Sequence, residues 1–196
     1  MMAVDSKEAS RDRPARRALF TDRDGTLGPD LRYLKEAERF ELFRGVGAAI
    51  ALAHARGYLV VCVTNQSGIE RGFYTREDVE RIHRRVNELL ASSKTLVDAF
   101  YYCPHAPESH CACRKPGTLL FEQARREWHI DFGTSAIIGD RNIDIEAGRR
   151  LGLLTAYVPN TARPGEEAQE FPAGSPPPDI RAESFADAVA QILARA

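Results

Sequence analysis

Apolar residues gather along the chain in short continuous runs, separated by longer segments of mixed character. The runs have the length of buried strands and predict strands at residues 18–20, 58–63, 99–102, 135–139 and 154–158. The longer segments between and after these runs mix apolar and polar residues, as helices that pack on one side against a core do. They predict helices at residues 45–57, 75–90, 117–128, 143–152 and 185–196. Strands that alternate with helices in this way predict an α/β fold, in which helices cover both faces of a parallel sheet.

Capping residues mark the ends of two predicted helices. Thr75 stands where an N-cap belongs, and Asp78 follows three residues later, as in an acidic relative of the capping box. Gly57 stands where the helix at 45–57 should end, since glycine readily adopts the left-handed conformation of a C-terminal cap. These signals support the helix boundaries.

The chain has 196 residues, which fits one domain with short tails. Residues 1–16 are charged and lack the apolar core of a signal peptide, so we expect a flexible N-terminal tail. Residues 17–196 should form a single domain. Within it, residues 160–178 are rich in Pro, Gly and Glu and should form an exposed loop.

Composition narrows the possible partners. Apolar residues make up 43% of the chain and charged residues 28%, as in ordinary globular proteins. The formal net charge of -1 provides no basic field that would attract nucleic acid or an anionic membrane. No apolar run is long enough to span a bilayer. We therefore expect a cytoplasmic protein, by default a monomer, that acts on a small molecule.

Polar motifs follow three of the predicted strands at the point where each strand ends. Asp22 and Asp24 follow the first strand, Thr64 and Asn65 the second, and Asp140 the fourth. Ligands of parallel sheets bind beyond the carboxyl ends of the strands, so the three motifs should meet in one crevice. A polar turn is the alternative for "DRDGT" taken alone, but unrelated turns would have no reason to share this placement.

Paired carboxylates in such a crevice suit phosphoryl transfer. Asp22 can attack phosphorus to form an aspartyl-phosphate, and Asp24 can protonate the leaving oxygen and later activate water. The two carboxylates would repel a phosphate dianion without a hard cation. Mg²⁺ fits because it takes oxygen ligands, and Asp140 would supply a further one from the neighbouring strand.

Other side chains can balance the charge of a phosphate. Gly25 lets backbone N–H groups approach it, and Thr64 can donate a hydroxyl. Lys115, in "CRKP", can place an ammonium on the transferring group. Arg114 beside it is better suited to a second, non-reacting anion, where the bidentate geometry of a guanidinium helps.

Three of the four cysteines fall within "CPHAPESHCACRKP", together with two histidines. Three thiols and an imidazole suit a closed tetrahedral site for a structural zinc ion. The expected ligands are Cys103, His105, Cys111 and Cys113. A disulfide is the alternative, which the expected cytoplasmic setting disfavours. His110 is an alternative ligand, but its position next to Cys111 makes chelation awkward. Cys62, in "YLVVCV", is most simply a buried thiol.

The segments "DRDGT", "VTNQ", "RKP" and "GDRNID" occur in the order of the four motifs of the haloacid dehalogenase superfamily of phosphatases, which the chain resembles over residues 18–160. The resemblance implies a Rossmann-like phosphatase domain, here with a zinc-bound loop and no large cap domain. The implied catalytic residues are Asp22, Asp24, Thr64 and Lys115. The implied Mg²⁺ ligands are Asp22, Asp140 and Asp24, the last through its backbone carbonyl. Asp144 either supports the metal through water or is an acid at a helix start.

Two families of this superfamily share such a zinc loop, the heptose bisphosphate phosphatases and the histidinol-phosphate phosphatases. "TNQSGIERGFYT" resembles the former, which implies a phosphorylated sugar as substrate, with Arg114 at its second phosphate. The short spacer between His105 and Cys111 resembles the latter, so both substrates stay open. The expected substrate-binding residues are Asp30, Tyr33, Asn65, Gln66, Ser67, Arg71, Arg114 and Arg141.

Two remoter alternatives belong to other functional classes. A polynucleotide 3′-phosphatase would require a basic groove with stacking aromatic side chains, which the net charge of -1 and 8% aromatic residues do not support. A non-catalytic binding protein on the same fold would be expected to lack one of the motif aspartates, yet Asp22, Asp24 and Asp140 are all present.

Overall fold

The computed structural model describes residues 14–159 and 176–195. The expected N-terminal tail, up to residue 13, and residues 160–175 of the expected exposed loop lie outside the described residues. Among those described, no helix is both long and apolar enough to cross a membrane.

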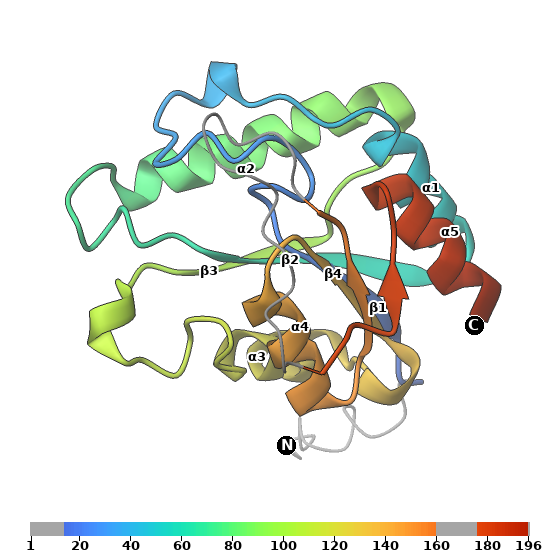
Figure 1. Cartoon of the computed structure of the whole chain (residues 1–196). Helices are drawn as coiled ribbons and strands as arrows, with labels where there is room; N and C mark the ends of the chain where they lie inside the picture. Colours follow the sequence, from blue (N-terminus) through green and yellow to red (C-terminus); the bar gives the residue numbers. More distant parts are fainter. Residues whose placement is uncertain (1–13, 160–175, 196) are drawn as a thin grey trace, which may run out of the picture.

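Six parallel strands form one sheet in the order β3-β2-β1-β4-β5-β6 (Figure 1). Their bounds are β1 Arg17–Thr21, β2 Tyr58–Asn65, β3 Ala99–Cys103, β4 Ala136–Gly139, β5 Leu154–Tyr157 and β6 Ile180–Arg181. The first five match the runs predicted from the sequence. The two-residue strand β6 was missed, because so short a segment carries no periodicity of its own.

Five α-helices pack on this sheet, with bounds α1 Val46–Ala55, α2 Arg76–Leu90, α3 Leu119–Trp128, α4 Asn142–Leu151 and α5 Phe185–Arg195. All five were predicted within about two residues of these bounds. The cap of α2 is the expected reciprocal one: the Asp78 backbone N–H donates to Thr75 Oγ1 at 3.2 Å, and the Thr75 N–H donates to Asp78 Oδ2 at 2.7 Å. Gly57 follows α1 with a φ of 80°.

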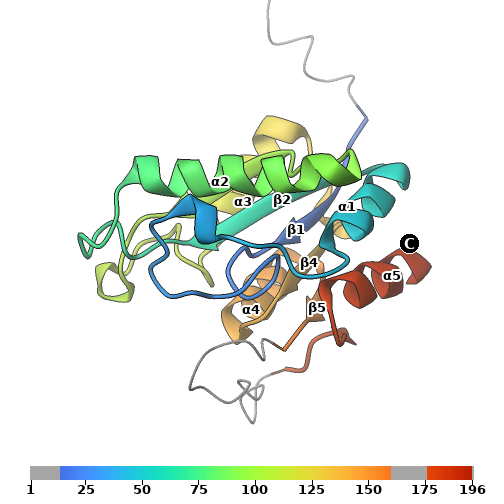
Figure 2. The ribbon, with the colours of Figure 1, turned by 90° about the horizontal axis from the view of Figure 1, so that it is seen from above.

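The helices form two layers because successive residues of each strand face opposite sides of the sheet. Leu19 of β1 packs with apolar residues of α1, α2 and α5, whereas Ala18 and Phe20 pack with α3 and α4. Figure 1 shows these two layers on either side of the strands, and Figure 2 shows the layer of α1 and α2 from above. The result is the α/β sandwich expected from the sequence, with no large cap domain among the described residues.

Parallel pairing brings the carboxyl ends of the strands to one edge. β1 ends at Thr21, β2 at Asn65, β3 at Cys103 and β4 at Gly139. Each polar motif begins at or just after one of these ends, so the topology gathers motifs that are far apart in the sequence.

Candidate active site

A pocket of about 300 Å³ opens at this edge of the sheet. Its walls come from the segments that follow β1, β2, β3 and β4. The lining includes every residue expected from the sequence to take part in catalysis or substrate binding, namely Asp22, Asp24, Asp30, Tyr33, Thr64, Asn65, Gln66, Ser67, Arg71, Arg114, Lys115 and Arg141. A volume of this size accommodates a small polar ligand.

Asp22 and Lys115 form the buried centre of the pocket. The Asp22 backbone N–H donates to the carbonyl of Ile138 at 3.1 Å, which fixes the start of the loop after β1 against β4. The side chain of Asp22 is almost wholly buried, and its Oδ1 lies 2.9 Å from Lys115 Nζ. The ammonium also donates to the carbonyl of Val63 at 2.6 Å. A carboxylate is thus held next to a cation with little water around either.

Lys115 remains charged despite its burial. Burial opposes the charge, but the carboxylates of Asp144 and Asp22 outweigh it and raise the pKa of Lys115 above its usual value. Asp144 Oδ1 lies 2.6 Å from the ammonium. Burial raises the pKa of Asp144, Lys115 opposes that shift, and Asp22 adds to it. Lys115 therefore keeps the permanent positive charge that a transferring phosphoryl group requires.

Asp24 points into a different set of partners. Arg23 donates to both of its oxygens, from Nε to Oδ1 at 3.0 Å and from Nη2 to Oδ2 at 2.8 Å. Gln66 Nε2 donates to Oδ2 at 2.8 Å and to Thr64 Oγ1 at 2.9 Å. Asp24 therefore has side-chain partners different from those of Asp22, although both residues line the same pocket.

Asn65 ties the strand β2 to the loop that carries Lys115. Its Nδ2 donates to the Lys115 carbonyl at 3.2 Å, and its Oδ1 accepts the Lys115 backbone N–H at 3.0 Å. This pair of hydrogen bonds holds the lysine backbone in register with the end of β2, so that the side chain reaches Asp22.

Arginines line the outer part of the pocket. Arg114 Nη1 donates to the carbonyl of His105 at 3.2 Å. Arg141 pairs with Asp30 at 3.3 Å, and Arg71 pairs with Glu108, also at 3.3 Å. Tyr33 stands at the same rim, with its ring centroid 4.5 Å from that of Phe73. The three arginines come from three separate loops, and the side chain of each is more exposed than that of Lys115.

Cys103, His105, Cys111 and Cys113 form a compact cluster whose ligand atoms all lie within 4.8 Å of one another. His105 Nδ1 is 3.2 Å from the Cys113 sulfur, and the Cys111 sulfur is 3.5 Å from those of Cys103 and Cys113. All four cysteines of the chain are free thiols, so the alternative of a disulfide is not realised. His110 is exposed and lies outside the cluster. The four expected metal donors therefore lie together, and the histidine among them is His105 and not His110.

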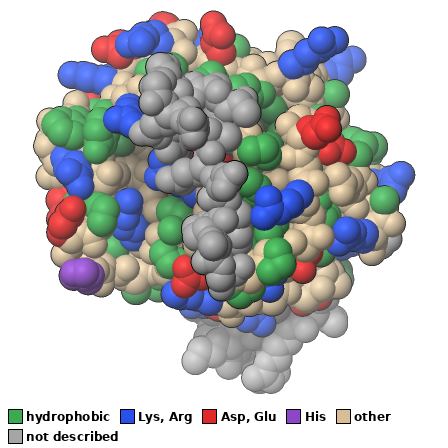
Figure 3. Space-filling model, viewed as in Figure 1, with side chains coloured by type: hydrophobic (Ala, Val, Ile, Leu, Met, Phe, Trp, Pro, Cys, Tyr) green, Lys and Arg blue, Asp and Glu red, His purple; other side chains and the backbone are tan. Residues whose placement is uncertain are grey.

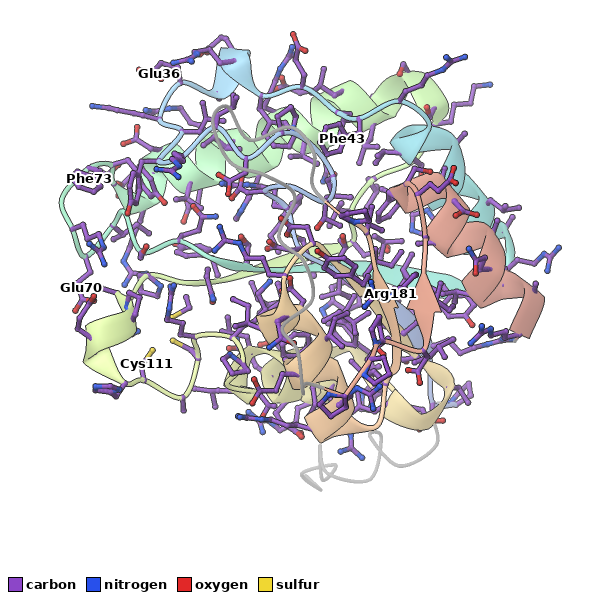
Figure 4. The ribbon with its side chains drawn as sticks, in the orientation of Figure 1. Glu36, Phe43, Glu70, Phe73, Cys111 and Arg181 are labelled. Carbon is purple, nitrogen blue, oxygen red and sulfur yellow. The ribbon has the colours of Figure 1, made fainter. Side chains whose placement is uncertain are left out.

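The loop after β2 supports this cluster. Glu70 accepts hydrogen bonds from the Ala106 N–H and from Ser109 Oγ, both within the segment between the ligands. Figure 4 shows Cys111 at the same end of the molecule as Glu70 and Phe73. Because Arg114 and Lys115 directly follow Cys113, whatever orders the cluster also orders two residues of the pocket.

Comparison with known proteins identifies the family. A family model described as HAD-hydrolase-like matches residues 112–188. A probable D-glycero-D-manno-heptose-1,7-bisphosphate 7-phosphatase of Thermoplasma acidophilum is 37% identical over 144 residues, which cover 73% of this chain and 90% of that protein. The chain belongs to the haloacid dehalogenase superfamily of phosphatases.

Other relatives carry the same name. A D-glycero-beta-D-manno-heptose-1,7-bisphosphate 7-phosphatase of Helicobacter pylori is 41% identical over 145 residues, covering 74% of this chain and 81% of that protein. The crystal structure of a D,D-heptose 1,7-bisphosphate phosphatase from B. bronchiseptica, complexed with magnesium and phosphate, has a TM-score of 0.77. It is 28% identical and covers 92% of this chain and 99% of that one.

The acidic residues of this superfamily member fit a divalent cation. Carboxylate oxygens of Asp22, Asp140 and Asp144 lie within 4.8 Å of one another, and all three residues are buried. Thr26 Oγ1 donates to Asp140 Oδ1 at 3.4 Å. Three buried carboxylates carry more negative charge than Lys115 can balance, and hard oxygen donors are the ligands that Mg²⁺ takes. The donor set therefore suits the metal that accompanies the B. bronchiseptica structure.

Sequence reasoning left Asp144 out of the site, although the structure places it in this acidic cluster. A signal was present: Asp144 stands four residues after Asp140, on the first turn of α4. Gly139 is a second one, since a Cβ there would come within 2.3 Å of Asp144 Cβ. Arg23 and Tyr74 were also missed, because neither residue type marks a site when read alone.

Proposed function

We propose that this phosphatase removes the 7-phosphate of D-glycero-D-manno-heptose 1,7-bisphosphate, with Mg²⁺, through an aspartyl-phosphate formed on Asp22. One observation carries the proposal: the same pocket holds a buried carboxylate–lysine centre and, further out, Arg71, Arg114 and Arg141 from the loops after β2, β3 and β4. The centre suits a reacting phosphate, and the arginines suit a second one. The names of the relatives agree with a bisphosphorylated heptose.

In the first step, an oxygen of Asp22 attacks phosphorus while the bond from phosphorus to the sugar oxygen breaks. Asp24 gives a proton to the departing oxygen, which leaves as an alcohol. Lys115 Nζ and the hydroxyl of Thr64 donate to the oxygens of the transferring group. Asp22, Asp140 and the backbone carbonyl of Asp24 would hold Mg²⁺, which would supply positive charge to balance that of the phosphate.

In the second step, Asp24 takes a proton from a water molecule whose oxygen bonds to phosphorus. The bond between phosphorus and Asp22 breaks, which releases inorganic phosphate and restores the carboxylate. The cation of Lys115 stays in place throughout, since its raised pKa keeps it protonated. Asp22 thus acts as the nucleophile and Asp24 as the acid and base. Their different hydrogen-bond partners are consistent with these different roles.

The substrate-binding residues divide between the two ends of the bisphosphate. Asn65, Gln66 and Ser67 directly follow Thr64 at the end of β2 and are assigned to the reacting phosphate. Arg114 is assigned to the second phosphate, with Arg71 and Arg141 beside it. Asp30 and Tyr33, at the rim, are assigned to the hydroxyl groups of the sugar between them.

We also propose that the cluster of Cys103, His105, Cys111 and Cys113 holds a structural zinc ion. Four protein ligands leave no open position for a substrate. The zinc would order the loop that delivers Arg114 and Lys115. Nucleic acid is not expected as a partner, because the net charge of -1 provides no basic field. Figure 3 shows acidic as well as basic side chains on the face it displays. A cytoplasmic monomer remains the expected state.

Phosphate release with Mg²⁺ tests the proposal. The substrates are heptose 1,7-bisphosphate, as both anomers, and histidinol phosphate, and Asp22→Asn is the control for the nucleophile. We expect the highest kcat/KM for a heptose bisphosphate and no turnover by Asp22→Asn. A preference for histidinol phosphate would overturn the sugar assignment and favour the family with the shorter zinc loop. Activity that survives Asp22→Asn would overturn the aspartyl-phosphate.

A further inference from the structure

We propose that Arg23, together with Gln66 and Tyr74, positions Asp24 for its two proton transfers. The inference rests on the proposed function, in which Asp24 is the acid and the base. None of the three acts on the substrate's phosphorus in that mechanism. They contact Asp24, or a group that contacts it, and they fix where its oxygens lie in the pocket.

One edge of the Arg23 guanidinium binds the carboxylate of Asp24. Nε and Nη2 of Arg23 donate to the two different oxygens of the carboxylate, at 3.0 and 2.8 Å. A bidentate pair of this kind fixes the plane of the carboxylate as well as its distance. The side chain of Asp24 itself is partly open to the pocket, with a relative exposure of 21%. Rotation of Asp24 is thereby restricted while it stays within reach of a ligand.

Arg23 is itself rigid because it is buried. It is among the largest fully buried side chains of the described residues, with a relative exposure of 1%. Burial disfavours its charge, but the carboxylate of Asp24 outweighs that effect and raises the pKa of Arg23 further. A buried guanidinium has few alternative rotamers and no water to pair with, so Asp24 is its essential partner. The ion pair of Arg23 with Asp24 therefore differs from those at the surface of the protein, whose side chains are exposed to water.

Tyr74 determines which way Gln66 faces. Its hydroxyl donates to Gln66 Oε1 at 2.7 Å, so the amide nitrogen of Gln66 must point the other way. That nitrogen donates to Asp24 Oδ2 and to Thr64 Oγ1, at 2.8 and 2.9 Å. Burial raises the pKa of Tyr74 to about 12, and the hydroxyl is in any case protonated at neutral pH, so that it can donate. A third, directed hydrogen bond thus reaches Asp24, from the loop that follows β2.

The position of Asp24 affects the rate of proton transfer to the leaving oxygen. A proton passes efficiently only when donor and acceptor oxygens are correctly placed, and a misplacement of about 1 Å can cost about 100-fold. The leaving oxygen of an alkyl phosphate needs that proton. The p-nitrophenolate ion leaves without one, so hydrolysis of p-nitrophenyl phosphate depends far less on Asp24 in the first step. Comparison of the two leaving groups therefore isolates the positioning of Asp24.

The test measures kcat/KM for heptose 1,7-bisphosphate and for p-nitrophenyl phosphate, because this quantity reports the step up to formation of the aspartyl-phosphate. Arg23→Gln should lose about 10- to 100-fold on the sugar phosphate and less than about threefold on the aryl phosphate. Arg23→Lys should recover part of the loss, since lysine retains the charge without the bidentate edge. Tyr74→Phe keeps the ring and should show the same contrast, though smaller.

Two further variants calibrate the result. Asp24→Asn gives the contrast expected when the acid is absent. Arg81→Gln is a matched control, because Arg81 pairs with Asp78 on α2 and neither lines the pocket; it should change neither substrate's kcat/KM. Thermal unfolding of each variant separates loss of fold from loss of positioning, and Tyr74→Phe remains informative if Arg23→Gln does not fold.

Equal losses on the two substrates in both Arg23→Lys and Tyr74→Phe would overturn the inference, because a purely structural role affects both alike. An Asp24→Asn enzyme without the contrast would overturn it too, along with the acid role in the proposed function. If the wild type prefers another alkyl phosphate and the contrast persists there, the heptose assignment fails while the positioning role is supported.

Discussion

At the scale of single residues, Asp144 is the addition that the structure makes to the motif aspartates. Asp144→Asn keeps the size of the side chain and an oxygen to accept the Arg141 N–H, which now donates to Oδ2 at 3.1 Å. It removes one negative charge from the acidic cluster and from Lys115. We expect the Mg²⁺ concentration for half-maximal activity to rise about 10- to 100-fold. Titration of phosphate release with Mg²⁺ measures it.

Asp131 offers a control for this variant. It also begins a short helical turn, where its Oδ1 accepts the Gly133 N–H at 3.0 Å, but it does not line the pocket. Asp131→Asn should leave the Mg²⁺ requirement at the wild-type value. If Asp144→Asn did the same, Asp144 would be no more than an acid at the start of α4.

Individual residues also show how far the site could be predicted from the sequence. Asp22 and Asp140 could be predicted because their motifs follow strand ends, and a parallel sheet brings strand ends together. Lys115 follows no strand end and was predicted from its place in "CRKP". The role of Arg23 could not be predicted, because it depends on the burial of its side chain and on a hydrogen bond to the neighbouring residue Asp24. Spacing shows which elements meet, whereas burial and rotamers decide which side chains touch.

At the scale of elements, helix α2 packs on the sheet partly through a histidine, His83, that is buried in its uncharged form. His83 stacks on Phe100 of β3 with ring centroids 4.3 Å apart. Burial, with a smaller contribution from Arg23, lowers its pKa to about 2. An unfolded histidine has a pKa of about 6.5. As the pH falls below that value the unfolded chain takes up a proton that the folded chain excludes, so stability falls.

His83→Phe should remove this dependence and keep the ring stack. Between pH 7 and pH 5, the free energy of unfolding should fall by about 2 kcal/mol less in the variant than in the wild type. Urea unfolding at the two pH values measures the difference. The same fall in both proteins would mean that His83 is protonated in the folded state.

In the proposed function, the loop between Cys103 and Cys113 would connect zinc binding to substrate binding. Lys115 has a second anchor, two hydrogen bonds to Asn65, whereas the guanidinium of Arg114 donates to the carbonyl of His105, a residue of the cluster itself. Cys111→Ser should therefore lose the zinc and raise KM for the bisphosphate about tenfold, as expected for one charged hydrogen bond. The decrease in kcat should be smaller.

Metal analysis of the purified protein and steady-state kinetics in excess Mg²⁺ check this prediction together. Glu108→Gln is a suitable control on the same loop, since Glu108 is exposed and pairs with Arg71 outside the cluster. It should leave the zinc content unchanged. A drop in kcat without a change in KM would contradict the division of roles between Arg114 and Lys115.

At the scale of the whole molecule, recognition of phosphate is local rather than global. The net charge of the chain is -1, and both signs of charge are interspersed on the face seen in Figure 3. The pocket nevertheless combines Lys115 with Arg71, Arg114 and Arg141, which the fold brings together from loops after β2, β3 and β4. An anion is therefore attracted by this pocket and not by the protein as a whole, so binding should depend on which loops contact it.

The second phosphate provides the sharpest test of that arrangement. Arg114→Gln should lower kcat/KM for heptose 1,7-bisphosphate about 10- to 100-fold, because one charged, bidentate contact is lost. For heptose 7-phosphate, which lacks the other anion, the same variant should stay within about twofold of the wild type. The ratio of the two kcat/KM values cancels any general damage to the enzyme. Equal losses on both sugars would place Arg114 at the reacting phosphate and leave the second anion to Arg71 and Arg141.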